Sequence, residues 1–172
     1  LAGVYLPTEG LVLPVYFEST DNAMGLGIVI SAMAGGGVVG AFLYGTLRRR
    51  FSYKTIARMV LIGTAAALIP MSLLPPLPIL AGFGFLLGLA WGPMNPLINS
   101  LVQTRVPADL QGRVFAIELS LFYSFPPIAM LVTGFAIDGI GVKAVYPILT
   151  ALVVVGSVLT LGTRALRTLD QA

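Results

Sequence analysis

Long apolar stretches follow one another along the chain and constrain its fold more than any other feature. Windows near residues 23–47, 55–74, 79–102, 114–137 and 144–163 each hold about 20 predominantly apolar residues. That length crosses about 30 Å of hydrocarbon at a helical rise of about 1.5 Å per residue. Residues 1–17 form a sixth, shorter stretch. We therefore predict an all-α integral membrane protein with six transmembrane helices.

The composition supports a membrane environment and narrows the chemistry. Hydrophobic residues make up 57% of the chain and charged residues 10%, whereas soluble domains carry about 25% charged residues. The surplus apolar surface must face lipid, so the bilayer is the first predicted partner. The sequence contains no Cys and no His, which excludes disulfides and His- or Cys-based metal sites or catalysis. We predict no enzyme activity, no cofactor and no metal.

The basic residues gather at joints that six alternating spans would place on one face. They are Arg48, Arg49, Arg50, Lys54 and Arg58 after the second window, Arg105 and Arg113 after the fourth, and Arg164 and Arg167 in the tail. The opposite joints carry Glu18, Asp21, Asp138 and Lys143. By the positive-inside rule, the basic joints and the C-terminus are predicted to be cytoplasmic in a multi-pass protein of the cell membrane. Topology and attraction to anionic lipid explain these charges better than nucleic-acid binding.

Glycines at intervals of four predict close helix packing. Gly36 and Gly40 follow Ala32 in the second window, and Gly84, Gly88 and Gly92 repeat the spacing in the fourth. Small residues at this spacing let helix backbones approach in lipid. We expect two tight helix crossings and no phosphate-binding loop, since the glycine runs lack the accompanying Lys.

The fourth window also predicts a broken helix. Pro93 and Pro96 remove backbone donors near the middle of the membrane, and irregular backbone at that depth is tolerated only against protein or a watery cavity. Trp91, Asn95, Asn99 and Gln103 form a polar stripe at intervals of four. Cavity lining and structural packing are equally open for Trp91 and Asn95, while interhelical hydrogen bonding is favoured for Asn99 and Gln103. The fifth window repeats the pattern with Tyr123, Ser124, Pro126 and Pro127.

Two carboxylates fall inside predicted spans. Glu9 precedes Phe17 by eight residues, about 12 Å at helical rise, which places it near the bilayer midplane. Such a group faces the bundle interior, finds a partner or takes up a proton, so proton coupling and a structural hydrogen bond are equally open. Pro7 and Pro14 predict an interrupted helix around it. Glu118 lies only five residues beyond Arg113, so anchoring at the interface or to an arginine is favoured.

Three of these segments resemble one family. Residues 7–16, PTEGLVLPVY, are similar to the helix that opens the C-terminal half of major facilitator superfamily transporters in the drug-, macrolide- and siderophore-exporter branch. Residues 106–115, VPADLQGRVF, resemble the branch's joint between the tenth and eleventh helices, and Gly92-Pro93-Met94-Asn95-Pro96 resembles its preceding helix. The likeness extends over the whole chain, and the joint is its most specific part.

The resemblance implies a domain organisation and a set of site residues. Residues 1–172 would form the C-terminal six-helix half-bundle of a twelve-helix alternating-access transporter, with the N-terminal half of the same polypeptide absent from this chain. The family's cytoplasmic motif maps onto residues 45–54, where Gly45, Arg50 and Lys54 fit but Arg49 replaces the acid and Ser52 the second glycine. These residues, with Gly112 and Arg113, are the predicted cytoplasmic gating loops. The candidates for proton coupling or substrate contact are Glu9, Trp91, Asn95 and Tyr123.

We predict from these features a secondary active transporter that exports a small amphipathic molecule by proton-coupled alternating access. An amphipathic solute is favoured over a sugar by the aromatic side chains of Trp91, Tyr123 and Tyr16. A channel is the first alternative, because Asn95-Pro96-Leu97 resembles one of the two turns that water channels require. A non-transporting membrane scaffold and an intramembrane enzyme are further alternatives, the enzyme disfavoured by the absence of an acid clearly paired with Glu9.

Overall fold

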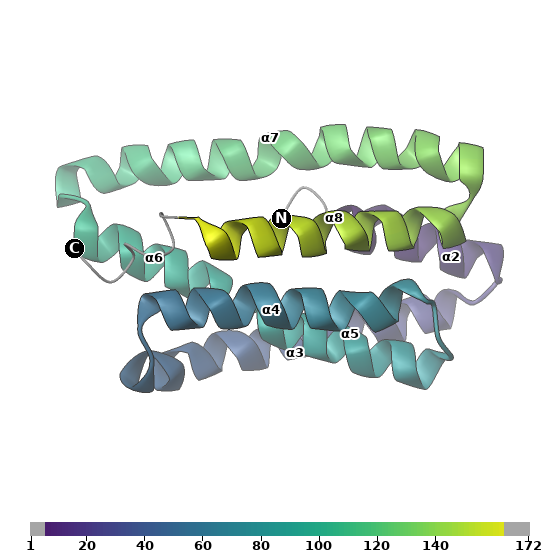
Figure 1. Cartoon of the computed structure of the whole chain (residues 1–172), viewed down its shortest axis with the longest axis horizontal. Coiled ribbons are helices and arrows are strands. Elements are labelled where there is room, and N and C mark those ends of the chain that lie inside the picture. The colour runs from purple at the N-terminus through teal and green to yellow at the C-terminus, as the bar shows by residue number, and fades with distance from the viewer. Residues whose placement is uncertain (1–5, 164–172) are drawn as a thin grey trace.

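The fold is a bundle of helices that run roughly along one axis (Figure 1). A computed structural model describes residues 6–163 of the chain. A short π-helical segment begins this part, and seven α-helices follow. They are η1 (Thr8–Val12), α2 (Leu13–Ser19), α3 (Ala23–Arg50), α4 (Tyr53–Ser72), α5 (Leu77–Trp91), α6 (Met94–Arg105), α7 (Ala108–Ile140) and α8 (Val142–Gly162).

Five segments in the described residues are long and apolar enough to cross a membrane. They are α3, α4, the combined stretch Leu77–Arg105, α7 and α8. They correspond to the five full-length windows predicted from the sequence, with ends that shift by a few residues. The sixth window, residues 1–17, coincides with η1 and α2, and its first five residues lie outside the described part.

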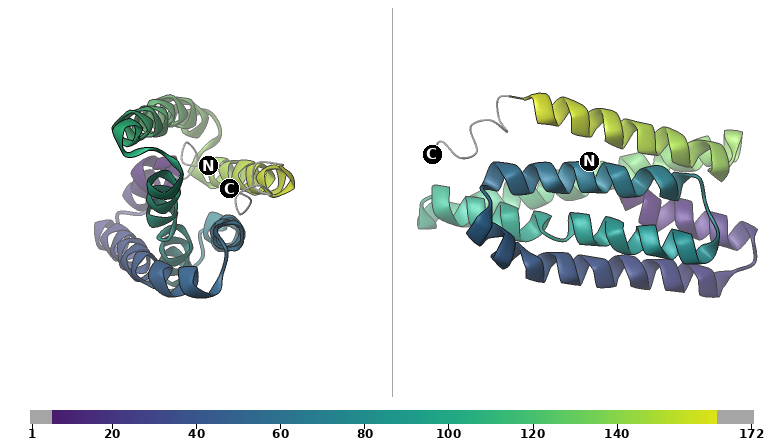
Figure 2. Two further views of the ribbon diagram at one scale, coloured as in Figure 1. Left: turned by 90° about the vertical axis from the view of Figure 1, so that its left-hand side faces the viewer. Right: turned by 60° about the horizontal axis from the view of Figure 1, so that its bottom comes forward.

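The joints alternate between the two ends of the bundle (Figures 1 and 2). The two-residue joint between α3 and α4 and that between α6 and α7 lie at one end. The joints between α2 and α3, between α4 and α5 and between α7 and α8 lie at the other end. The arginines at residues 48–50 and at 105 therefore share one end of the molecule. Arg164 and Arg167 lie outside the described residues.

Local capping explains where several helices begin. The Asn22 side chain accepts a hydrogen bond of 2.9 Å from the backbone N–H of Gly25 at the start of α3. The Ser52 hydroxyl accepts one of 3.3 Å from the N–H of Thr55 at the start of α4, so both caps satisfy an orphan donor. Gly141 alone separates α7 from α8 and has φ 80, a left-handed conformation that glycine adopts without a steric penalty.

The two glycine ridges meet each other in one crossing, where two separate crossings were expected. A Cβ built at Gly36 or Gly40 of α3 would collide with the carbonyl oxygens of Phe85 and Leu89 in α5, respectively. A Cβ at Gly88 of α5 would collide with the Met33 carbonyl oxygen in α3. Ala32 stands half-buried beside this contact, and Met33 takes the buried position. The small residues thus allow backbone-to-backbone contact between α3 and α5.

The predicted break in the fourth window is confirmed. Helix α5 ends at Trp91, and α6 begins at Met94 after a turn at Gly92 and Pro93. Pro93 has no N–H to offer the carbonyl of Leu89 one turn earlier, and glycine beside it adds backbone freedom. Figure 2 shows α6 continuing beyond this turn as a separate short helix.

The matching expectation for the fifth window is wrong, because α7 continues through Pro126 and Pro127 without interruption. No glycine adjoins these prolines. The Ser124 hydroxyl donates a hydrogen bond to the Ser120 carbonyl one turn back, and such side-chain bonds help transmembrane helices tolerate proline.

Burial is uneven across the bundle. The main core cluster gathers apolar residues from α2, α3, α4, α5 and α8, among them Leu13, Met71 and Tyr146. Only 6% of the most apolar window of α7 is buried, compared with 44% for α4. Large apolar side chains are therefore exposed along α7, such as Phe135 at 70% exposure. Surface of this kind suits lipid or another membrane segment rather than water.

Candidate transport site

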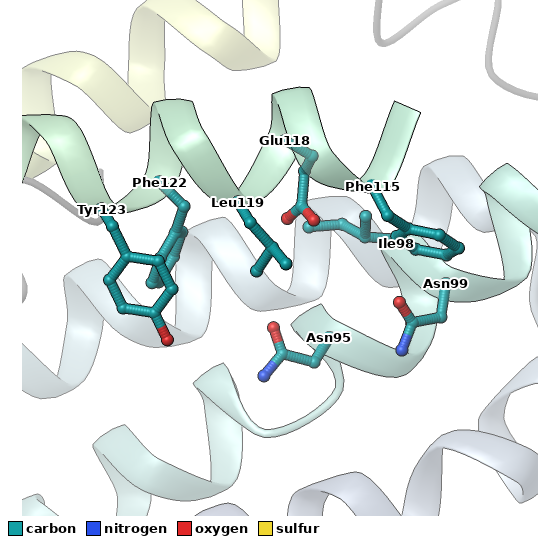
Figure 3. A pocket seen from close by; sticks show the side chains of 8 residues that line it. All are labelled: Asn95, Ile98, Asn99, Phe115, Glu118, Leu119, Phe122 and Tyr123. Atoms are coloured by element: carbon teal, nitrogen blue, oxygen red, sulfur yellow. The ribbon is translucent and has the colours of Figure 1, made fainter. Parts of the chain in front are cut away.

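A groove between α6 and α7 is the strongest candidate site. Its volume is about 310 Å³, which is within the range of small-molecule sites. The lining residues are Asn95, Ile98 and Asn99 from α6 and Phe115, Glu118, Leu119, Phe122 and Tyr123 from α7. In Figure 3 the Glu118 carboxylate and the Tyr123 hydroxyl extend from α7 toward the side on which α6 carries Asn95. Polar and apolar groups thus share one groove within candidate membrane spans.

The sequence builds each wall of this groove by helical spacing. Residues 115, 118, 119, 122 and 123 follow the i, i+3, i+4, i+7, i+8 pattern that places side chains on one helix face. Asn95 and Asn99 are four apart on α6, so they also share a face. The break at Gly92 and Pro93 sets the direction of α6 independently of α5.

Two of the predicted site residues come together here. Asn95 and Tyr123 both line the groove, and Tyr123 is 66% exposed. Trp91 does not line it, since it ends α5 and packs half-buried against the main core cluster. The predicted stripe is split because the turn at Gly92 and Pro93 separates Trp91 from the residues of α6.

The interhelical hydrogen bonds expected of Asn99 and Gln103 are absent from the described residues. Asn99 is exposed and lines the groove, and Gln103 is exposed on α6. Neither side chain has a hydrogen-bond partner within residues 6–163. Asn99 therefore belongs with Asn95 as a polar group that faces open space.

Glu118 is the charged residue of the groove, and the sequence interpretation placed it differently. Its side chain is half-buried. Within residues 6–163 it forms neither an ion pair with an arginine nor a hydrogen bond. The expected anchoring to an arginine of the joint is thus not found. Helix α7 instead directs this side chain toward α6 (Figure 3).

Glu9 lies in the π-helical turn η1 and is half-buried. The backbone N–H of Leu13 donates to the Thr8 carbonyl five residues earlier, so the turn around Glu9 is wider than an α-helical one. Pro14 cannot donate to the Gly10 carbonyl, which favours this irregularity. The helix is therefore irregular beside Glu9, but the predicted interruption is not found, because η1 continues into α2 without a break. Glu9 is not among the residues that line the α6–α7 groove.

The predicted gating loops are mostly helical. Gly45 and Arg50 belong to α3 and Lys54 to the first turn of α4, so the joint itself is only residues 51–52. Gly112 and Arg113 lie in the second turn of α7 rather than in a loop.

The basic joint between α3 and α4 is held by Arg48. Its guanidinium donates a hydrogen bond of 3.1 Å to the Phe51 carbonyl. The guanidinium carbon also stands 3.7 Å from the centroid of the Tyr53 ring, a cation–π contact. These two contacts connect the end of α3 to the joint and to the start of α4.

Sequence reasoning missed Phe115 and Phe122 as groove residues and assigned Glu118 to another role. The signal that could have found them is the spacing of three and then four residues that joins Phe115, Glu118 and Phe122. That pattern marks one face of α7 but does not say which helix lies opposite.

Comparison with known proteins identifies the family. Residues 2–119 match the sequence profile of the Major Facilitator Superfamily. The multidrug efflux pump Tap of Mycobacterium tuberculosis (strain ATCC 25618 / H37Rv) is 33% identical over 172 residues, which is 100% of this chain and 41% of that protein. The protein of the same name in Mycolicibacterium fortuitum is 31% identical over 170 residues, 99% of this chain and 42% of that protein.

A third relative covers less of the chain. The uncharacterized MFS-type transporter YuxJ of Bacillus subtilis (strain 168) is 30% identical over 94 residues, 55% of this chain and 24% of that protein. No solved structure matches the chain.

The chain belongs to the major facilitator superfamily. The predicted resemblance to its exporter branch agrees with the names of the two mycobacterial relatives. The chain spans about two fifths of the length of those relatives, 41% and 42%.

Proposed function

We propose that this chain is the C-terminal six-helix half of a twelve-helix transporter that exports a small amphipathic molecule across the cell membrane by alternating access. The α6–α7 groove would form part of the wall of its central cavity, with Asn95 and Tyr123 as substrate contacts. The groove is the observation that carries the proposal, since it combines carboxamides, a carboxylate and aromatic rings within candidate spans. The relatives named multidrug efflux pump support export.

The missing N-terminal half would cover the exposed side of the bundle. Helix α7 supports this role, because only 6% of its most apolar window is buried. In alternating access, two half-bundles rock against each other around a central site. Lipid would cover the remaining apolar surface, and no nucleic acid is involved. The basic end with the α3–α4 and α6–α7 joints would be cytoplasmic, so Arg50, Lys54 and Arg113 would face the rocking seam there.

Glu9 is the proposed proton-coupling residue. Its place in a π-helical turn supports this role, since such turns occur frequently at functional sites. The half-buried carboxyl group would exchange a proton with water that reaches it from alternate sides of the membrane. Trp91 would hold the α5–α6 turn against the core.

The test is transport by the full-length protein in proteoliposomes, with fluorescent amphipathic dyes as solutes. A carrier gives saturable movement that accelerates when unlabelled solute is present on the opposite side. Asn95→Leu and Tyr123→Ala are expected to lower the rate at least about tenfold, because each removes a polar or aromatic contact to the solute.

Phe125→Ala is the matched control for Tyr123→Ala. Phe125 is also on α7 and is 62% exposed, but it does not line the groove. Equal loss in both aromatic variants would contradict the assignment of the groove. Passive flux without saturation would favour a channel, and no flux of any solute would favour a membrane scaffold.

A further inference from the structure

Glu118 places a negative charge in the groove without a counter-charge. It is the one charged residue among the eight lining residues. Within residues 6–163 its carboxylate has no ion-pair or hydrogen-bond partner. A carboxylate in low-dielectric surroundings is costly unless a cation or hydrogen-bond donors satisfy it. A positively charged group in the groove would therefore neutralise the Glu118 carboxylate.

The other lining residues suit the body of an organic cation. The rings of Phe115, Phe122 and Tyr123 come from the same wall as Glu118, and aromatic rings attract a cation placed over their faces. The carboxamide oxygens of Asn95 and Asn99 accept hydrogen bonds from an N–H group. Ile98 and Leu119 supply apolar contact.

We propose that the α6–α7 groove binds small amphipathic organic cations and that Glu118 supplies their counter-charge. This inference rests on the proposed transport function and adds the charge of the substrate to it. A basic side chain from the rest of the polypeptide is the competing partner for Glu118. The volume of about 310 Å³ favours the solute, because one guanidinium or ammonium group would leave most of such a space unfilled.

The experiment compares two solutes of similar size that differ in charge. The full-length protein in detergent is tested for binding of the tetraphenylphosphonium cation and of neutral triphenylphosphine oxide, and both are then tested for transport in proteoliposomes. Glu118→Gln keeps the shape and removes the charge. It is expected to weaken binding of the cation at least about tenfold and to leave the neutral solute within about twofold.

Two further variants keep the test decisive. Asn99→Lys places an ammonium group in the same groove, so it is expected to reproduce the selective loss of cation binding without removing Glu118. Glu18→Gln removes an exposed carboxylate at the other end of the bundle and should change neither affinity.

Different outcomes test the binding of cations at Glu118 and the proposed transport function. Selective loss of the cation in Glu118→Gln and Asn99→Lys supports the inference. Unchanged cation binding in these variants overturns the inference, even when saturable transport of the neutral solute supports the proposed transport function. Equal loss of both solutes, with a lowered melting temperature in Glu118→Gln, also overturns it, because Glu118 then pairs with a basic residue elsewhere in the polypeptide. Absence of any carrier-type flux in the wild-type protein refutes the transport function itself.

Discussion

Gly88→Ala is expected to destabilise the bundle even though alanine is the better helix former. The added methyl carbon would collide with the Met33 carbonyl oxygen and would stand 2.8 Å from the Gly37 nitrogen, both backbone atoms of α3. Backbone cannot rotate away as a flexible side chain can, so α3 and α5 must separate. Even a gap on the order of 1 Å forfeits up to about half of the dispersion attraction along the contact.

The magnitude follows from a matched control on the same helix. A Cβ at Gly82 of α5 would meet nothing within 4 Å, so Gly82→Ala should gain the helix propensity of alanine, about 1 kcal/mol. Gly88→Ala gains the same propensity and loses packing, and overpacking costs about 1–3 kcal/mol. Because the clash is with backbone, we expect the upper part of that range. The two variants should therefore differ by about 2–3 kcal/mol in free energy of unfolding.

The assay is equilibrium unfolding of the full-length protein in mild detergent, on addition of a denaturing detergent. Gly35→Ala on α3 is a second control, since its Cβ would also meet nothing within 4 Å. We expect both control variants to match or exceed the wild type and Gly88→Ala to unfold at lower denaturant. If Gly88→Ala is as stable as Gly82→Ala, the α3–α5 crossing is not a close backbone contact and the reasoning fails.

Two further predictions concern coupling and orientation. Glu9→Gln should still bind and exchange solute at equilibrium but lose proton-gradient-driven transport, because the amide cannot release a proton, while Glu9→Asp should keep part of the driven transport. Glu18→Gln is the control. A normal driven rate in Glu9→Gln would assign Glu9 a structural role. Cysteines introduced at Ser52 and Asp21 lie at opposite ends of the bundle, so a membrane-impermeant thiol reagent outside intact cells should label only the second. Labelling at position 52 alone would reverse the proposed orientation.

The sequence determined the features that depend on local chemistry. Apolar length located the five full-length membrane-spanning segments, because each helix must satisfy its own backbone in lipid. The break at Gly92 and Pro93 was predicted from prolines, which lack a backbone donor, and the irregular turn around Glu9 was anticipated from Pro7 and Pro14 in the same way. The resemblance to the superfamily was likewise present in short motifs.

The tertiary structure decided what those segments meet. The glycine spacing predicted close contacts, but only the packing of α3 against α5 showed that the two ridges face each other. Pro126 and Pro127 lack backbone donors as Pro93 does, yet α7 continues through them. The spacing between Arg113 and Glu118 does not distinguish a carboxylate at the membrane interface from one in a groove. The position of α6 opposite α7 places Glu118 in the groove. Periodicity fixes which side chains share a helix face, whereas the opposing surface depends on residues distant in the chain.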